Sequence, residues 1–89
     1  MMIKDGYILR KFDYKFVAVY VGDDNSKHSQ LITLNTTGAY IWKLLSSGNK
    51  SREEIVRKIT DDFAVTPDVA QVDVDEFIDI VRNAGLLNE

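Results

Sequence analysis

The segment at residues 34–42 constrains the fold most, because its sequence, Leu-Asn-Thr-Thr-Gly-Ala-Tyr-Ile-Trp, changes a β-strand into an α-helix within one turn. Residues 31–34 are typical of the end of a strand. Downstream, apolar residues recur at the three- and four-residue spacings of one helix face, at Ile41, Trp42, Leu44 and Leu45. Between the two elements, Asn35, Thr36 and Thr37 can accept hydrogen bonds from the unpaired amides of a helix start. If the anchored strand lies at a sheet edge, its backbone can bind a ligand.

Three strands are predicted before this switch. Residues 7–12 and 16–21 are rich in β-branched and aromatic side chains, and a short connection separates them. A polar turn at residues 22–26 precedes a third strand at residues 29–34. Short connections between consecutive strands favour an antiparallel three-stranded meander.

Three helices are predicted after the switch. The first covers residues 37–45 and ends at a segment that contains Gly48. Ser51 and Glu54 form a capping-box pattern at the start of the second helix, whose apolar stripe is Ile55, Val56, Ile59 and Phe63. Thr66 and Pro67 begin the third, which runs to Asn83 before Gly85, and Leu86 and Leu87 fold back onto the core. We therefore predict one α+β domain over residues 1–89, with a three-stranded antiparallel sheet followed by three helices.

The third predicted helix has two distinct faces. At 100° per residue, one face carries a coherent apolar stripe that we expect to be buried, formed by Val74, Phe77, Ile78 and Val81. The other face mixes aliphatic groups with carboxylates, at Val69, Val72, Asp73, Glu76 and Ile80. That second face is either an ordinary solvated surface with incidental valines or the wall of a groove that packs apolar side chains and pairs basic ones.

The charge of the chain is divided unevenly. Residues 1–50 carry a net charge of +3 and residues 51–89 carry −6. The third predicted helix alone has five carboxylates against one arginine, Arg82. Such a helix repels phosphate and attracts basic partners.

Composition excludes several classes of function. The chain has no cysteine, so disulfides, thiolate metal sites and thiol nucleophiles are excluded. The only histidine, His28, lies in a polar turn without an evident catalytic partner, and we expect no catalytic residue, metal site or cofactor. No apolar run approaches the roughly 20 residues that span a bilayer, and no signal peptide is apparent. We expect a cytoplasmic protein that does not contact membranes.

Three segments together resemble the PqqD-like family, the recognition elements for ribosomally made peptide natural products. After the predicted strands, the chain reads LNTTGAYIWKLLSSG, then SREEIVRKITDDF, then DVDEFIDIVRNAGLL. The resemblance covers residues 8–87. The matching positions include Leu34-Asn35, Gly38, Ile41-Trp42, Gly48, Glu54-Ile55, Asp75, Phe77 and Gly85-Leu86-Leu87.

The resemblance implies a winged-helix-like domain that binds the leader segment of a precursor peptide and catalyses nothing itself. In that mode the leader adds as a strand beside the third strand, against the third helix. On this chain the strand residues are Leu31, Ile32, Thr33 and Leu34, and the helix wall is Val69, Val72, Asp73, Glu76 and Ile80. The acidic wall predicts a leader with Lys or Arg flanking aliphatic or aromatic anchors. The resemblance also implies a modifying partner, such as a radical S-adenosylmethionine enzyme or a leader peptidase.

Two other functions are compatible with such a fold. A winged-helix DNA-binding regulator would need basic side chains on its exposed helix, and the acidic balance argues against nucleic acid as a partner. A general protein–protein adaptor is the other alternative. An exposed edge strand would also permit a homodimer, by pairing or exchange of strands.

Overall fold

The structure is a computed structural model and describes residues 1–13, 15–21 and 32–89. Its strands are β1 (Met2–Ile3), β2 (Tyr7–Phe12), β3 (Lys15–Tyr20), β4 (Ile32–Leu34) and β5 (Leu87–Asn88). Its helices are α1 (Thr36–Ser46), α2 (Arg52–Phe63) and α3 (Pro67–Asn83). The predicted fold class, a three-stranded antiparallel sheet followed by three helices, is confirmed.

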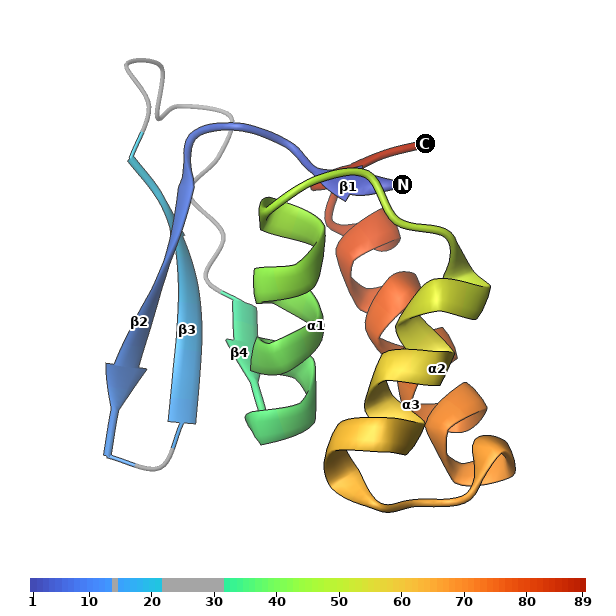
Figure 1. The fold of residues 1–89 in the computed structure, drawn as a ribbon. Coiled ribbons are helices and arrows are strands. Elements are labelled where there is room, and N and C mark those ends of the chain that lie inside the picture. Colours follow the sequence, from blue (N-terminus) through green and yellow to red (C-terminus); the bar gives the residue numbers. More distant parts are fainter. Residues whose placement is uncertain (14, 22–31) are drawn as a thin grey trace.

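The sheet has the order β2-β3-β4, and both pairings are antiparallel. Phe16 lies opposite Leu34, Val17 opposite Thr33 and Ala18 opposite Ile32. Helix α1 stands between this sheet and the pair of helices α2 and α3 (Figure 1). Among the described strands, β4 therefore forms one edge of the sheet, and it leads directly into α1.

The core gathers side chains from the sheet and from all three helices. The largest fully enclosed side chains are those of Ile41, Leu45, Ile55, Ile59, Val74 and Val81. The predicted stripe of α3 is confirmed, since Val74, Phe77, Ile78 and Val81 are all buried. Trp42 is 3% exposed, and its ring meets the ring of Tyr7 in β2 nearly edge-on, with 6.2 Å between centroids. This contact joins α1 to the sheet.

Two strand boundaries differ from the sequence prediction. Strand β3 begins at Lys15 and ends at Tyr20, one residue earlier at each end than predicted. The reason is the hairpin register: Phe12 pairs with Lys15, which leaves a connection of two residues. The residue that begins this connection, Asp13, has φ 56°, a conformation that suits two-residue hairpin turns. The first part of the third predicted strand, residues 29–31, lies outside the described residues.

Each helix starts at a side-chain cap that the sequence indicated. The Asn35 side chain accepts a hydrogen bond from the Gly38 amide at 2.7 Å, so α1 begins at Thr36, one residue before the predicted start. Ser51 and Glu54 form the predicted capping box, with both hydrogen bonds at 3.2 Å. The Thr66 hydroxyl accepts from the Val69 amide, and Pro67 occupies the first turn.

Helices α1 and α3 end in different ways. Helix α1 stops at Ser46 without a left-handed glycine, because the Ser47 hydroxyl donates to the Leu44 carbonyl and closes the last turn at 2.8 Å. After α3, Gly85 has φ 77°, and the amide of the buried Leu86 donates to the Val81 carbonyl at 2.9 Å. This is the Schellman arrangement, in which glycine adopts the left-handed conformation and an apolar residue covers the helix end.

Helix α2 ends at a residue in an unfavourable conformation. Ala64 caps it with φ 53° and ψ 37°, a left-handed conformation that costs a non-glycine residue about 1 kcal/mol or more. We expect Ala64→Gly to raise the free energy of unfolding by about 0.5–1 kcal/mol, measured by urea denaturation. Ala84→Gly is the matched control, because Ala84 caps α3 with right-handed φ −83° and should gain nothing from glycine. If both substitutions change the free energy of unfolding by the same amount, Ala64 is not strained.

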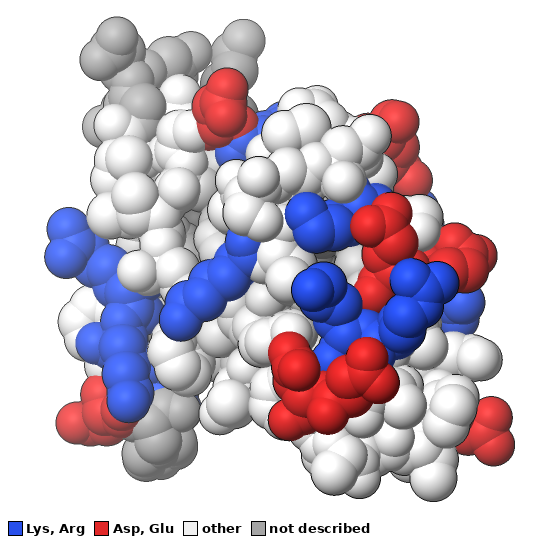
Figure 2. All heavy atoms as spheres, viewed as in Figure 1, with Lys and Arg blue, Asp and Glu red and all other residues white. Residues whose placement is uncertain are grey.

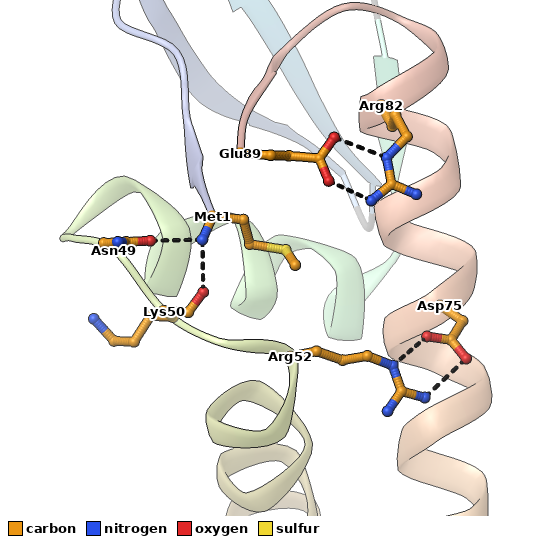
Figure 3. A network of polar contacts seen from close by, with 7 residues as sticks. All are labelled: Met1, Asn49, Lys50, Arg52, Asp75, Arg82 and Glu89. Carbon is orange, nitrogen blue, oxygen red and sulfur yellow. Dashed lines mark hydrogen bonds and ion pairs between the residues drawn. The ribbon is translucent and has the colours of Figure 1, made fainter.

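A small second sheet, not predicted from the sequence, joins the two ends of the described chain. Met2 pairs with Asn88 and Ile3 with Leu87. Figure 3 shows the adjoining polar contacts: the Met1 amino group donates to the Asn49 side chain at 2.5 Å and to the Lys50 carbonyl at 2.9 Å. These contacts tie β1 to the segment between α1 and α2.

Two arginine–carboxylate pairs brace α3. The Arg52 guanidinium at the start of α2 donates to both carboxylate oxygens of Asp75, at 2.7 and 2.9 Å, and Arg82 contacts Glu89 in the same two-point manner (Figure 3). Hydrogen bonding to Arg52 holds the pKa of Asp75 below its ordinary value. Because the pKa is lowered in the folded state, the pair stabilises the fold at neutral pH, and its contribution is lost as the pH falls through the pKa of the folded state.

Candidate functional site

Strand β4 offers an open sheet edge. Within the described residues it pairs with β3 on one side and with no strand on the other. Ile32 and Leu34 point into the core, whereas Thr33 is exposed. In an antiparallel strand, alternate residues direct both backbone groups to the same side. Either Thr33 or its two neighbours therefore present an amide and a carbonyl to the outside.

A hollow of about 110 Å³ lies where the end of β4, the start of α1 and the middle of α3 meet. From the strand and the helix start it is lined by Thr33, Leu34, Asn35, Thr37 and Gly38, and from α3 by Asp73, Glu76, Phe77 and Ile80. The two groups are far apart in the sequence. The hollow thus combines an open strand edge with a helix wall.

The wall is amphipathic. Phe77 is buried and forms part of its base, while Ile80 is 48% exposed and offers an aliphatic surface to a ligand. Asp73 and Glu76 add two carboxylates. Within residues 1–13, 15–21 and 32–89, neither carboxylate forms an ion pair. Their charges are therefore available to a basic ligand.

Gly38 permits a close approach between strand and helix. A methyl group at this position would lie 3.3 Å from Leu34 Cβ and 3.2 Å from Asn35 Oδ1. Only glycine fits there without a shift of its neighbours. The helix start can therefore sit directly against the end of β4 and close one side of the hollow.

The structure brings together five of the nine site residues predicted from the sequence: Thr33, Leu34, Asp73, Glu76 and Ile80. Ile32 stands next to them on β4 with its side chain in the core. Val69 and Val72 are exposed on α3, nearer its start, and do not line the hollow. Leu31 lies outside the described residues.

Sequence reasoning did not assign Asn35, Thr37, Gly38 or Phe77 to the site. The strand-to-helix switch could have identified Asn35, Thr37 and Gly38. The segment that ends an edge strand also lies at the end of the groove beside that strand. Phe77 was assigned to the buried stripe; it is buried as predicted, and it also lines the hollow.

Charge is distributed unevenly over the molecule. In Figure 2, basic side chains follow the β2–β3 hairpin, whereas basic and acidic side chains are intermixed over the helices. The hairpin contributes Arg10, Lys11 and Lys15, all exposed, whereas α3 carries five carboxylates. A winged-helix protein that inserts its third helix into DNA needs the opposite charge on that helix.

In the described part of the chain, no group of three or more His, Cys, Asp or Glu side chains is placed to hold a metal ion. No described helix is long and apolar enough to cross a membrane. His28 lies outside the described residues.

Comparison with known proteins gives two matches. The model of the family described as coenzyme PQQ synthesis protein D (PqqD) matches residues 17–87. A solved structure, described as TbiB1 in complex with the TbiA(beta) leader peptide, is similar with a TM-score of 0.74 and 27% sequence identity, covering 99% of this chain and 95% of that one. A search of curated proteins found no match. Because the family model spans well over half of the sequence, the chain belongs to the PqqD family.

Proposed function

We propose that this protein binds the leader segment of a ribosomally synthesised precursor peptide and presents the peptide to a modifying enzyme. The observation that carries the proposal is the open edge of β4 beside the hollow on α3, in a chain of the PqqD family. The similar protein TbiB1 has been solved in complex with a leader peptide. The protein acts as a binding partner and leaves the chemistry to the enzyme.

The leader binds as an added strand. Its backbone pairs with the outward amide and carbonyl groups of β4, and this pairing supplies affinity without reading the sequence. Side chains of the leader then alternate between the α3 wall and the opposite face. Because Ile32 and Leu34 are fixed in the core, β4 is held in place before the peptide arrives.

The wall of α3 selects the side chains of the leader. An aliphatic or aromatic residue packs on Ile80 above Phe77, and Lys or Arg residues beside this anchor pair with Asp73 and Glu76. The carboxylates are solvent-accessible, so they set preference and association rate more than affinity. Val69 and Val72 extend the apolar surface toward the start of α3 for a longer peptide.

A calorimetric titration tests this proposal. The purified protein is titrated with leader peptides of short precursors encoded beside its gene, and we expect saturable one-to-one binding. A backbone N-methyl scan of the bound leader should then weaken binding at every second residue of the paired segment. Each lost backbone hydrogen bond costs about 1 kcal/mol, roughly fivefold in Kd.

The scan separates the mode of binding from binding itself. Losses confined to alternate positions support strand addition. Losses at consecutive positions indicate a helical leader and contradict strand addition, because every internal amide of a helix donates a hydrogen bond within the chain. Neutralising the basic residues of the leader is the matching side-chain test. Unchanged affinity after that neutralisation would contradict the role given to Asp73 and Glu76. A folded protein that binds none of the nearby leaders would favour a general adaptor.

A further inference from the structure

The sheet has a second open edge, and its chemistry differs from that of β4. Strand β2 pairs with β3 on one side and, within the described residues, with no strand on the other. Its last three residues, Arg10, Lys11 and Phe12, are exposed. Phe12 is 56% exposed, the second largest exposure among the large hydrophobic side chains of the described residues. Because side chains alternate along a strand, Arg10 and Phe12 lie on one face of β2, and Lys11 lies on the other face, over the ring of Phe16.

This segment has the chemistry expected of a ligand for the groove on α3. It is already extended, no strand of the described residues pairs with its outer edge, and it presents Phe12 and Arg10 on the same face. The groove offers an open strand edge, the aliphatic surface of Ile80, and the carboxylates of Asp73 and Glu76. The two surfaces match in backbone geometry, apolar character and sign of charge.

We propose that the β2 edge of a second copy of this chain occupies the β4–α3 groove when no leader is bound. The two edges lie on opposite sides of one sheet, so a chain cannot fill its own groove in this way. The contact joins different surfaces of the two copies and is heterologous. It uses the same groove as the proposed leader site, so self-association and leader binding exclude each other.

Sedimentation equilibrium of the protein alone tests this proposal. The average mass should rise with protein concentration, and it should fall back when ionic strength increases from about 0.1 M to about 1 M, because the Debye length then shrinks from about 10 Å to about 3 Å. Phe12→Asp should keep the protein monomeric. Arg10→Glu is a second variant at an exposed position, and it should weaken association without removing an apolar group.

Complementation identifies the surfaces involved. A Phe12→Asp chain keeps an intact groove, and an Ile80→Asp chain keeps an intact β2 edge. Each variant alone should be monomeric, whereas an equimolar mixture should form a one-to-one dimer, because one heterologous contact can still form. If the mixture stays monomeric while the wild type associates, the contact is of another kind and the proposal is wrong.

Leader binding distinguishes this proposal from the proposed function. Addition of a binding leader should dissociate the wild-type oligomer, and the Phe12→Asp chain should bind leader at least as tightly as the wild type. A wild type that binds leader yet stays monomeric at the highest soluble concentration would overturn the self-association alone. A wild type that associates through these surfaces but binds no leader would overturn the proposed function alone.

Discussion

Replacement of Ile80 by aspartate should abolish leader binding while the fold stays intact. Ile80 is half-exposed, so the substitution leaves no cavity in the core. The new carboxylate would lie where an apolar side chain of the leader packs and excludes water. Burying a charge there without a partner is costly in free energy. We expect a loss of at least about 2 kcal/mol, roughly thirtyfold in Kd, measured by calorimetric titration.

Two further variants isolate the cause. Val21→Asp introduces the same charge at an aliphatic residue of similar exposure, 55%, that does not line the hollow, and it should leave leader affinity unchanged. Ile80→Ala removes apolar surface without adding charge and should give a smaller loss. Circular dichroism of each variant checks the fold. Normal leader binding by Ile80→Asp would place the peptide elsewhere on the molecule.

Of the substitutions proposed for this protein, Trp42→Ala should lower the free energy of unfolding the most. Trp42 is almost fully buried and links α1 to Tyr7 in the sheet. Truncation of a large buried aromatic residue costs about 3–5 kcal/mol. A chain of 89 residues has a total stability of only about 4–13 kcal/mol at typical values per residue. The variant should therefore be partly or wholly unfolded at moderate urea concentration.

The measurement needs a probe other than tryptophan fluorescence, because Trp42 is the only tryptophan in the chain. Far-ultraviolet circular dichroism during urea denaturation serves for both proteins. Lys43→Ala, at the neighbouring exposed position of the same helix, is the control and should change stability very little. A Trp42→Ala variant that unfolds at the wild-type urea concentration would show that the ring does not anchor the sheet.

Elements with strong local signals were predictable from the sequence. The capping box at Ser51 and the proline after Thr66 mark helix starts through hydrogen bonds between neighbouring residues, which local sequence determines. The stripe on α3 was predictable because a helix of seventeen residues repeats its pattern several times. The pairing of β1 with β5 was not, because two-residue strands have no periodicity and their partners lie at opposite ends of the chain.

The groove was predictable in part, for a geometric reason. A helical projection shows angle around the axis but not position along it, so it grouped Val69 with Ile80. At 1.5 Å per residue, Val69 lies about 6 Å before Asp73, the first residue of α3 that lines the hollow. Val72 directly precedes Asp73 but is turned about 100° from it around the helix axis, so it does not line the hollow. Strand β4 is three residues long and meets α3 only near Asp73, Glu76 and Ile80. The local sequence does not specify where two distant elements cross.

The pairing of β1 with β5 has a consequence for how this fold can be joined to other proteins. Both ends of the described chain leave the molecule side by side, near the segment that follows α1 (Figure 1). The groove lies at the start of α1, and a helix of eleven residues separates the two places by about 16 Å. A tether at either end, or both ends spliced into a loop of a larger host, would leave the groove open. The same fold can thus operate as a separate partner or as an inserted module.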